Sequence, residues 1–578
     1  MKKFTQNVNK DKLFNDLPVV IPQKSKWGTR WANYMSCNVG DIQPIYVDEV
    51  LPNEKRKVTM AMTSHLTTPV APIFNSLYTE IRAFFIPDRL CVDLLNGYKT
   101  RKSPWVKVFG EDNASDSSKI IVPLAEQKLP DFTTEHSFIS DLAGVYDNIS
   151  GLDSVYDSLD LLPSDYDANE YAGLCDFNFL TLAAYELIYQ RHYRNENYET
   201  ATESPLYQLL FDAYNPDKDS VSSDKLLAFT FEKANREKDY FTGIKPFTQK
   251  GDPVTVNIPG EAPVLAGTNT RKSGISINAD APDAIILGLA AEDANQYIQS
   301  DIEDSNTNVV DGRIDTGLGG SLYADLSSVK GISIEELRLL IKTQELLEKD
   351  AIYGSRYISS LNAHFGTCPL DLTLQDPQEL YKTIITSQMQ AIFQTSTTKD
   401  EDSILGTIGA NSTTQTDPFV ILPETTFHEH GILMICAVHK LQNVYDSSIF
   451  IPKFNFKKSR FDFYTPELND LGYQPVTSKE MRVGASGTKG FNEAFAEYRY
   501  KFNKVHGRLK QEFPYWAPAI ADEYETVASL YKEDPAILDK ALSVLSDTAP
   551  QFYDAWGFEE ENTKPMSLHS IPGMDGVI

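Results

Sequence analysis

The sequence contains few cysteines, and they follow no pattern that cysteine chemistry requires. The five cysteines are scattered and odd in number, without a C-x-x-C pair: Cys37, Cys91, Cys175, Cys368 and Cys436. Disulfide frameworks and zinc sites use even numbers or close spacings of cysteine. We therefore expect neither, and the pattern is typical of a protein that assembles in a reducing cytosol.

Long apolar runs are also missing. No stretch approaches the roughly 18 apolar residues of a membrane span. The first residues, MKKF, lead into polar sequence and not into the apolar stretch of a secretory signal. We therefore expect a soluble intracellular product with no membrane insertion.

Positive charge is scarce. The 53 Lys and Arg residues stand against 81 Asp and Glu, which gives a formal net charge of -28. A chain this acidic is not expected to coat nucleic acid over its whole surface, because phosphate binding needs clustered cations. The acidity either keeps the protein soluble or reflects a specific role of an acidic surface.

Residues 450–510 are the basic exception, with twelve Lys and Arg against six Asp and Glu, a net of +6. At residues 498–502 (YRYKF) aromatic and basic side chains alternate, so a strand there would present rings on one face and cations on the other. Such a pattern is typical of a surface that holds single-stranded nucleic acid, or of a strand with an aromatic core face and a basic solvent face. The candidate residues of this patch are Arg499, Lys501, Lys504, Arg508 and Lys510.

Two stretches are predicted as long surface loops. Residues 110–176 hold fifteen acidic side chains against two basic ones, a net of -13. Residues 261–330 are rich in Gly, Ala, Ser, Asn and Asp. Loops of this length are usually functional.

Regular structure is predicted mainly as strands. Apolar residues alternate with small or polar ones at residues 57–63 and 253–258, which indicates strands with one buried face. Continuous apolar runs at residues 81–86 and 431–438 indicate strands buried on both faces. Such segments recur along the chain and favour an all-β sandwich or barrel. Helices are the minority, predicted at 177–191 and from a capping box at Ser333 to Leu347.

The search for catalytic motifs finds none. There is no G-x-S-x-G sequence, and the glycine-rich residues 484–490 lack the Gly-Lys-Ser/Thr order of a phosphate-binding loop. The sequence therefore predicts no enzyme, no catalytic residues and no cofactor.

Two weak candidates for metal sites are present, and each has an ordinary structural explanation as its alternative. His428 and His430 would point to the same face of a strand, but no third ligand is evident, so a packing or interface role competes. Asp304, Asn306 and Asn308 match the first oxygen positions of a calcium loop, which then fails at Val309 and Asp315, so an ordinary polar loop is the default.

Several collinear segments of the chain follow one known family pattern. The first is GDIQPIYVDEVLP at residues 40–52, where Asn53 replaces the glycine that follows in the family pattern. Later segments include AYELIYQRHYRN, LLEKDAIYGSRY and AEYRYK, at residues 184–195, 346–357 and 496–501, and the matches continue to SIPG at residues 570–573. Together these segments resemble the major capsid proteins of the Microviridae, within them the gokushovirus branch.

The resemblance implies an eight-stranded antiparallel jelly roll with long, partly helical insertions between strands, covering residues 1–578 as one capsid domain. It implies about sixty copies in a T=1 icosahedral shell around circular single-stranded DNA. It also implies a small basic DNA-packaging protein as a partner, assembly in the cytoplasm of a bacterial host, and residence in the virion. A scaffolding protein and a host surface receptor are further possible partners.

Position and charge extend these expectations. In gokushoviruses one insertion projects near the threefold axes and is thought to meet the host. We assign residues 261–330 to that projection, with the acidic 110–176 as the competing choice. Because a negative subunit must enclose a negative genome, we expect 450–510 on the interior and 110–176 on the exterior.

Two rival classes remain at this point. A jelly-roll enzyme or sugar-binding protein would need convergent carboxylates or a metal site, since the fold alone does not define function. A different virion component, such as a spike, would be distinguished by its stoichiometry in purified particles.

Overall fold

A computed structural model gives the structure of the chain, and two compact units emerge from it. The first comprises residues 1–248 with 350–578, and the second comprises Gln249–Lys349. The residues that the structure describes are 24–88, 90–91, 155–160, 180–200, 231–251, 264–266, 274–277, 285–288, 314–315, 322–324, 334–353, 376–387, 389–393, 408–482, 487–521 and 530–569.

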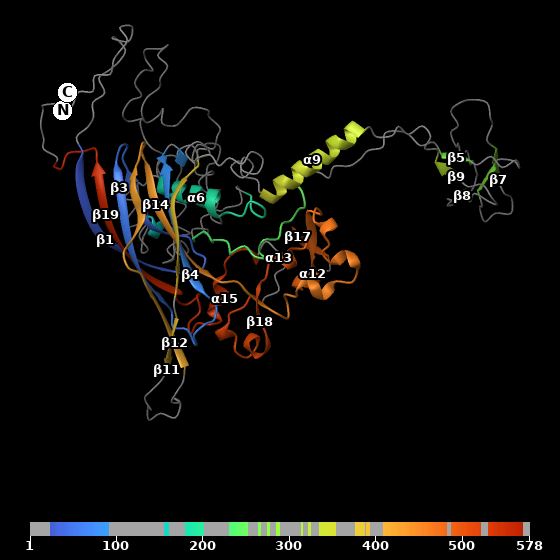
Figure 1. Cartoon of the computed structure of the whole chain (residues 1–578). Coiled ribbons are helices and arrows are strands. Elements are labelled where there is room, and N and C mark those ends of the chain that lie inside the picture. The colour runs from blue at the N-terminus through green and yellow to red at the C-terminus, as the bar shows by residue number, and fades with distance from the viewer. Residues whose placement is uncertain are drawn as a thin grey trace, which may run out of the picture. The chain divides into compact units, whose positions relative to one another are not determined.

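A six-stranded antiparallel sheet forms one layer of the first unit (Figure 1). Its order is β1, β19, β3, β12 and β11. The sixth strand, β13, pairs with a different stretch of β3 from the one that pairs with β12. The first and last of the named strands, β1 and β19, pair along their whole lengths. The bounds are β1 Ser25–Cys37, β3 Lys55–Leu66, β11 Met389–Phe393, β12 Ile408–Gln415, β13 Phe419–Thr426 and β19 Phe552–Lys564.

A four-stranded antiparallel sheet forms the facing layer, in the order β10, β4, β14, β2. The bounds are β2 Gln43–Val50, β4 Leu77–Pro87, β10 Gln378–Thr386 and β14 Gly431–Leu441. Apolar side chains from both sheets meet in one buried cluster, which includes Val58 and Met60 of β3, Leu433 of β14 and Trp556 of β19. The alternation predicted at residues 57–63 is confirmed, because every second side chain of β3 from Arg56 to Leu66 is buried.

The four-stranded sheet is covered on its other face as well. Helix α6 (Leu180–Ile188) continues as the π-helical turn η2 (Tyr189–Tyr193), and Phe84 of β4 contacts the rings of His192 and Tyr193. All eleven residues of β14 are buried, as the continuous apolar run at 431–438 predicted. A strand covered on both faces needs apolar residues in succession and not in alternation.

One glycine of β14 is required by close packing. A Cβ atom on Gly431 would lie 2.5 Å from a ring carbon of Phe85 and 2.6 Å from the carbonyl oxygen of Ile86. Glycine is therefore the residue that lets β14 begin against β4.

The segment between β14 and β19, residues 442–551, folds around a second buried cluster. This excursion core contains Tyr240, Phe241, Tyr445, Phe450 and Leu538. Its elements are short: β15 Val444–Asp446, η3 Lys453–Phe456, η4 Arg460–Asp462, η5 Pro466–Leu468, β16 Tyr473–Thr477, α12 Ser478–Met481, β17 Thr488–Glu493, α13 Ala496–Arg499, β18 Asn503–Val505, η6 Gly507–Lys510, η7 Pro514–Trp516 and α15 Pro535–Asp539.

The second unit is not the structureless loop that its composition suggested. It contains a two-stranded sheet, β5 (Val264–Ala266) with β9 (Leu322–Ala324), and a three-stranded sheet in the order β7, β6, β8. The bounds of these last strands are β6 Gly274–Ile277, β7 Ile285–Gly288 and β8 Ile314–Asp315. Small antiparallel sheets satisfy backbone hydrogen bonds that a bare loop would leave to water.

Both predicted helices are present, with shifted bounds. The helix expected at 177–191 is α6 with η2, and its side chains Leu180, Ala184 and Ile188 are buried. The helix expected from Ser333 is α9, Ile334–Tyr353, on which Leu337 and Ile341 are half exposed. The strand predicted at 253–258 lies outside the described residues, as does Ser333.

The described part of the chain is thus mostly strands in antiparallel sheets, as predicted. Of residues 110–176 the structure describes only 155–160, which carry the short helix α5 (Val155–Ser158). No helix among the described residues is long and apolar enough to cross a membrane.

Candidate interaction surface and buried polar network

The basic segment predicted as an alternating strand at 498–502 has a different local structure, and that prediction is wrong. Residues Ala496–Arg499 form helix α13, whose turn is closed by the Tyr500 N–H donating to the Ala496 carbonyl at 2.8 Å. Tyr498 and Tyr500 are about half exposed, whereas Phe502 packs against Phe241 of the excursion core at a ring separation of 4.7 Å. The rings therefore do not share a face, because the second core draws Phe502 inward.

Exposed aromatic and basic side chains nevertheless gather in this segment. We call the set the aromatic-basic surface. Its rings are exposed by 43% to 73%, more than expected of side chains that drive core packing. The members are Phe454, Phe461, Phe463, Tyr464, Tyr498 and Tyr500 with Lys458, Arg460 and Lys501.

Lys457 organises part of this surface. Its Nζ lies 4.1 Å from the centre of the Tyr498 ring and 5.3 Å from that of Phe463, and 2.7 Å from Oε1 of Glu497. Burial alone would lower the pKa of Lys457, but the bonds to Glu497 and Tyr498 outweigh it and raise the pKa above its ordinary value. The lysine is therefore charged at neutral pH and keeps the rings in place.

The five predicted basic-patch residues lie in this segment, and three of them are paired with carboxylates. Arg499 contacts Glu493 at 2.9 Å, Arg508 lies 3.7 Å from Glu512, and Lys510 lies 3.8 Å from Asp446. Pairing lowers the positive charge that remains for phosphate. The other two are Lys501, which is exposed, and Lys504, whose ammonium lies 4.6 Å from the centre of the Phe502 ring. Burial and the nearby Lys501 lower the pKa of Lys504.

Of the two predicted metal candidates, the structure describes only the histidine pair. His428 and His430 lie in the connection between β13 and β14 and are exposed, so the expectation that a strand aligns them is wrong. Asp304, Asn306 and Asn308 lie outside the described residues.

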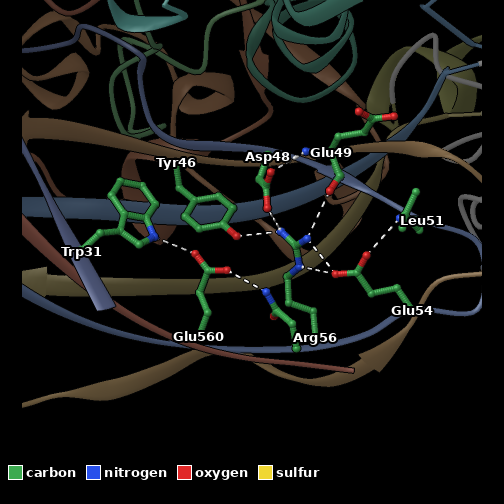
Figure 2. Close-up of polar contacts among 9 residues, drawn as sticks. Trp31, Tyr46, Asp48, Glu49, Leu51, Glu54, Arg56 and Glu560 are labelled. Atoms are coloured by element: carbon green, nitrogen blue, oxygen red, sulfur yellow. Dashed lines mark hydrogen bonds and ion pairs between the residues drawn. The ribbon is translucent and has the colours of Figure 1, made fainter. Parts of the chain in front are cut away.

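A buried polar network at one end of the sandwich was not foreseen. Arg56 of β3 has a fully buried side chain, and its guanidinium donates to Oε1 of Glu54 at 2.7 and 3.0 Å and to the Tyr46 hydroxyl at 2.8 Å (Figure 2). It also pairs with Asp48 and donates to the Glu49 carbonyl at 3.1 Å. The second carboxylate oxygen of Glu54 accepts the Leu51 N–H at 3.1 Å. The network thus holds the turn between β2 and β3.

The network is matched by a neighbouring set on the other strands of the sheet. Glu560 of β19 accepts from the indole N–H of Trp31 at 2.7 Å and from the amide of Asn562 at 3.0 Å. Figure 2 places this pair beside Tyr46, whose ring contacts Trp31 at 5.5 Å. Burial alone would lower the pKa of Arg56, but Tyr46, Asp48 and Glu54 outweigh it and raise the pKa.

A signal for Arg56 exists in the sequence. The run Lys55-Arg56-Lys57 looks like an exposed basic cluster, yet stepping back by two residues from the buried Val58 puts Arg56 on the inner face. A cation on an inner face demands anionic partners, and Asp48 and Glu54 stand close by in the sequence.

The turn also explains one departure of the sequence. Asn53 has a φ of 67°, in the left-handed region that glycine adopts most easily and that asparagine tolerates better than most residues. Its carbonyl and side-chain oxygens accept from Lys24 at 2.7 and 2.6 Å. Asparagine is therefore a compatible replacement at a glycine position.

Comparisons with known proteins match the chain to a family of phage capsid proteins. The chain matches the family described as capsid protein (F protein) over residues 20–159 and 171–574. It belongs to that family, and the relatives below are all Microviridae capsid proteins.

Three relatives carry the same printed name, capsid protein VP1. That of Bdellovibrio phage phiMH2K is 27% identical, covering 97% of this chain and 98% of the relative. That of Spiroplasma virus 4 is 28% identical over 93% of both chains. That of Chlamydia phage 1 is 24% identical over 97% of both chains. The likeness therefore spans the sandwich, the excursion and the second unit.

Proposed function

We propose that this chain is the major, non-catalytic shell protein of a T=1 icosahedral particle built from about sixty copies around circular single-stranded DNA. The observation that carries the proposal is membership of the capsid family over nearly the whole chain, joined to a two-layer sheet core. A shell role asks each subunit for several large interfaces, and the exposed rings of the aromatic-basic surface supply apolar contact area.

The core of this shell protein is an eight-stranded jelly roll in the proposal. Taking β1, β2, β3, β4, β10, β13, β14 and β19 as strands one to eight, the sheets read 1-8-3-6 and 2-7-4-5 once β12 and β11 are treated as additions. This order is that of two interleaved Greek keys, in which successive strands alternate between facing sheets except at strands four and five, β4 and β10, which pair within one sheet. The strand pairings support the assignment.

The aromatic-basic surface and the residues beside it face the packaged DNA in the proposal. Exposed rings and cations can stack bases and hold phosphates without sequence preference. Because Arg499, Arg508 and Lys510 are paired with carboxylates, each subunit contributes little net charge. A small basic packaging protein or bound cations are therefore needed to neutralise the genome. A scaffolding protein is a further partner that the proposal allows during assembly in the bacterial cytoplasm.

The second unit is the part we assign to the projection near the threefold axes and to contact with a host receptor. Residues 261–330 lie within it, and it forms a compact unit of its own. The acidic residues 110–176 belong to the exterior in this proposal, away from DNA.

Assembly is tested first by expressing the full chain in bacteria, sizing it by gel filtration and viewing it by negative-stain electron microscopy. Uniform shells, or pentamers that close when a scaffold is added, are the expected products. A stable monomer that never assembles, with or without the other proteins of the particle, would refute the shell role.

DNA contact is tested by titrating fluorescent single-stranded DNA into the unassembled chain at several salt concentrations. The double variant Lys501→Ala with Arg508→Ala should weaken binding and reduce the steepness of its salt dependence by about one unit. The matched control removes two exposed lysines of β3, Lys55→Ala with Lys57→Ala, and should leave the titration unchanged. Equal loss in both variants would mean that net charge, and not this surface, binds DNA.

A further inference from the structure

Beneath the surface, three reactive side chains join the two sheets of the sandwich. Cys37 ends β1, Asp554 lies near the start of β19, and His439 lies on β14. The thiol and carboxylate thus come from the six-stranded sheet and the imidazole from the four-stranded sheet. Within the part of the chain that the structure describes, this is the one group of three such residues whose ligand atoms all lie within 4.8 Å of one another.

The three side chains converge on one carboxylate oxygen. Nε2 of His439 lies 2.8 Å and Sγ of Cys37 lies 3.7 Å from Oδ2 of Asp554. All three residues are buried, with exposed fractions of 1%, 2% and 4% for Cys37, His439 and Asp554. The other oxygen, Oδ1 of Asp554, is buried with no hydrogen-bond partner. A buried anionic oxygen in that state is destabilising unless a cation compensates it.

The imidazole is held in a fixed orientation. Nδ1 of His439 lies 2.9 Å from the Thr79 hydroxyl oxygen, and the ring stacks on Phe552 with centres 4.1 Å apart. A hydroxyl can donate to Nδ1 or accept from it, so Thr79 tolerates either tautomer. When Thr79 accepts, the lone pair of Nε2 is directed at the cluster, which is the arrangement of a metal-ligating histidine with its supporting partner.

We propose that Cys37, His439 and Asp554 bind a zinc-type transition-metal cation that links the two sheets. Thiolate sulfur, imidazole nitrogen and carboxylate oxygen are all zinc ligands, whereas calcium and magnesium prefer oxygen alone. The fourth position falls to Oδ1 of Asp554 or to a water. Asp554 also belongs to the lining of a groove with Met35, Ser36 and Pro550.

A catalytic reading of the same residues does not hold. A nucleophilic cysteine must reach substrate as a thiolate, but Cys37 is buried, and burial together with Asp554 and Asp41 raises the pKa of its thiol well above the ordinary value. Without a cation the thiol therefore keeps its proton. Metal binding must expel that proton, so the affinity should fall as the pH is lowered.

The test is a titration of the chelator-treated full-length chain with Co²⁺ and Zn²⁺. We expect one metal per chain by elemental analysis and, with Co²⁺, a thiolate-to-metal charge-transfer band with the visible absorption of tetrahedral cobalt. Cys37→Ser should abolish the charge-transfer band and weaken binding at least tenfold. The matched control is Cys436→Ser, which removes another fully buried thiol, on β14, and should change neither readout.

Two results would overturn the proposal, one with the wild-type chain and one with a variant. If the wild-type chain gives no charge-transfer band, the three residues form only a hydrogen-bond network and the proposal is overturned. A band that persists in Cys37→Ser overturns it as well, because another thiolate must then be the ligand. The result does not depend on whether the chain builds a shell.

Discussion

Arg56 in the sandwich and Arg508 in the excursion carry the same charge in opposite surroundings. The Arg56 side chain is fully buried and bound by four different partners, whereas the Arg508 side chain is 80% exposed and 3.7 Å from a single carboxylate. A buried cation that loses its partners is costly, whereas an exposed pair contributes little. The comparison teaches that buried charges such as Arg56 stabilise the fold, whereas exposed charges such as Arg508 contribute little to its stability.

The largest effect is expected from Arg56→Ala. Removal of the guanidinium leaves Glu54 as a buried carboxylate without its cation, which should lower the free energy of unfolding by about 3–5 kcal/mol. Urea unfolding of the unassembled full-length chain measures it. The control is Arg30→Ala on β1, which removes an exposed partner of Glu559. The expected change in the free energy of unfolding is about 0–1 kcal/mol. Equal losses in the two variants would remove the distinction between buried and exposed pairs.

A buried charge outside the sandwich sharpens the comparison. Burial raises the pKa of Glu533 from 4.5 to about 7, despite the opposing charges of Arg236 and Lys440. Because the folded chain holds this proton more tightly than the unfolded chain, the linked stability is complete below pH 4.5 and is lost as the pH rises toward 7. Wild type should therefore lose on the order of 3 kcal/mol of unfolding free energy between pH 4.5 and 7 through this group, and Glu533→Gln should not show that loss.

The measurement is the unfolding free energy of wild type and Glu533→Gln at several pH values between 4.5 and 7.5. Asp88, whose pKa is raised to about 6 by burial and by Glu49 and Glu429, keeps a smaller slope of the same sign in both proteins. Parallel curves for the two proteins would contradict the assignment to Glu533.

Lys457 lies between the two extremes, and Lys457→Ala should have an intermediate effect. Its side chain is 4% exposed, and the change leaves Glu497 without its cation and the Tyr498 ring without its cation contact. We expect a loss of about 1–3 kcal/mol in the free energy of unfolding. Lys458→Ala at the exposed neighbour is the matched control. An equal loss of unfolding free energy in the control would mean that the effect does not depend on the burial of the lysine.

The smallest effect is expected from Arg508→Ala. The exposed pair with Glu512 should contribute less than about 1 kcal/mol to the free energy of unfolding. Thermal melting of the variant should therefore match wild type, while the DNA titration of the unassembled chain changes. A large drop in melting temperature would show that Arg508 has a structural role after all.

The sequence predicted the sheet core better than the site, for physical reasons. Period-two alternation in β3 and the unbroken apolar run of β14 are local consequences of one covered face and two covered faces, so they can be read from neighbouring residues. The segment at 498–502 alternates equally well, but the excursion core pulls Phe502 inward and α13 closes a helical turn. Long-range packing overrode the local pattern there.

The buried clusters were out of reach for a related reason. Cys37, His439 and Asp554 have no motif spacing, and only the pairing of β1 with β19 and the facing of the two sheets bring them together. Arg56 was within reach, because its parity with Val58 on β3 places it inward. Its partners Asp48 and Glu54 required the turn between β2 and β3 to be known.

The pairing of β1 with β19 has a consequence for how the protein is made. Arg30 and Glu559 pair across 529 residues of sequence, and the order of the described strands gives β1 no neighbour other than β19. A ribosome therefore releases β1 long before its partner exists, so the strand waits with an open edge throughout synthesis. Such contacts of high contact order close slowly and expose unfinished chains to aggregation. Folding of the sandwich is thus completed only after translation has passed β19.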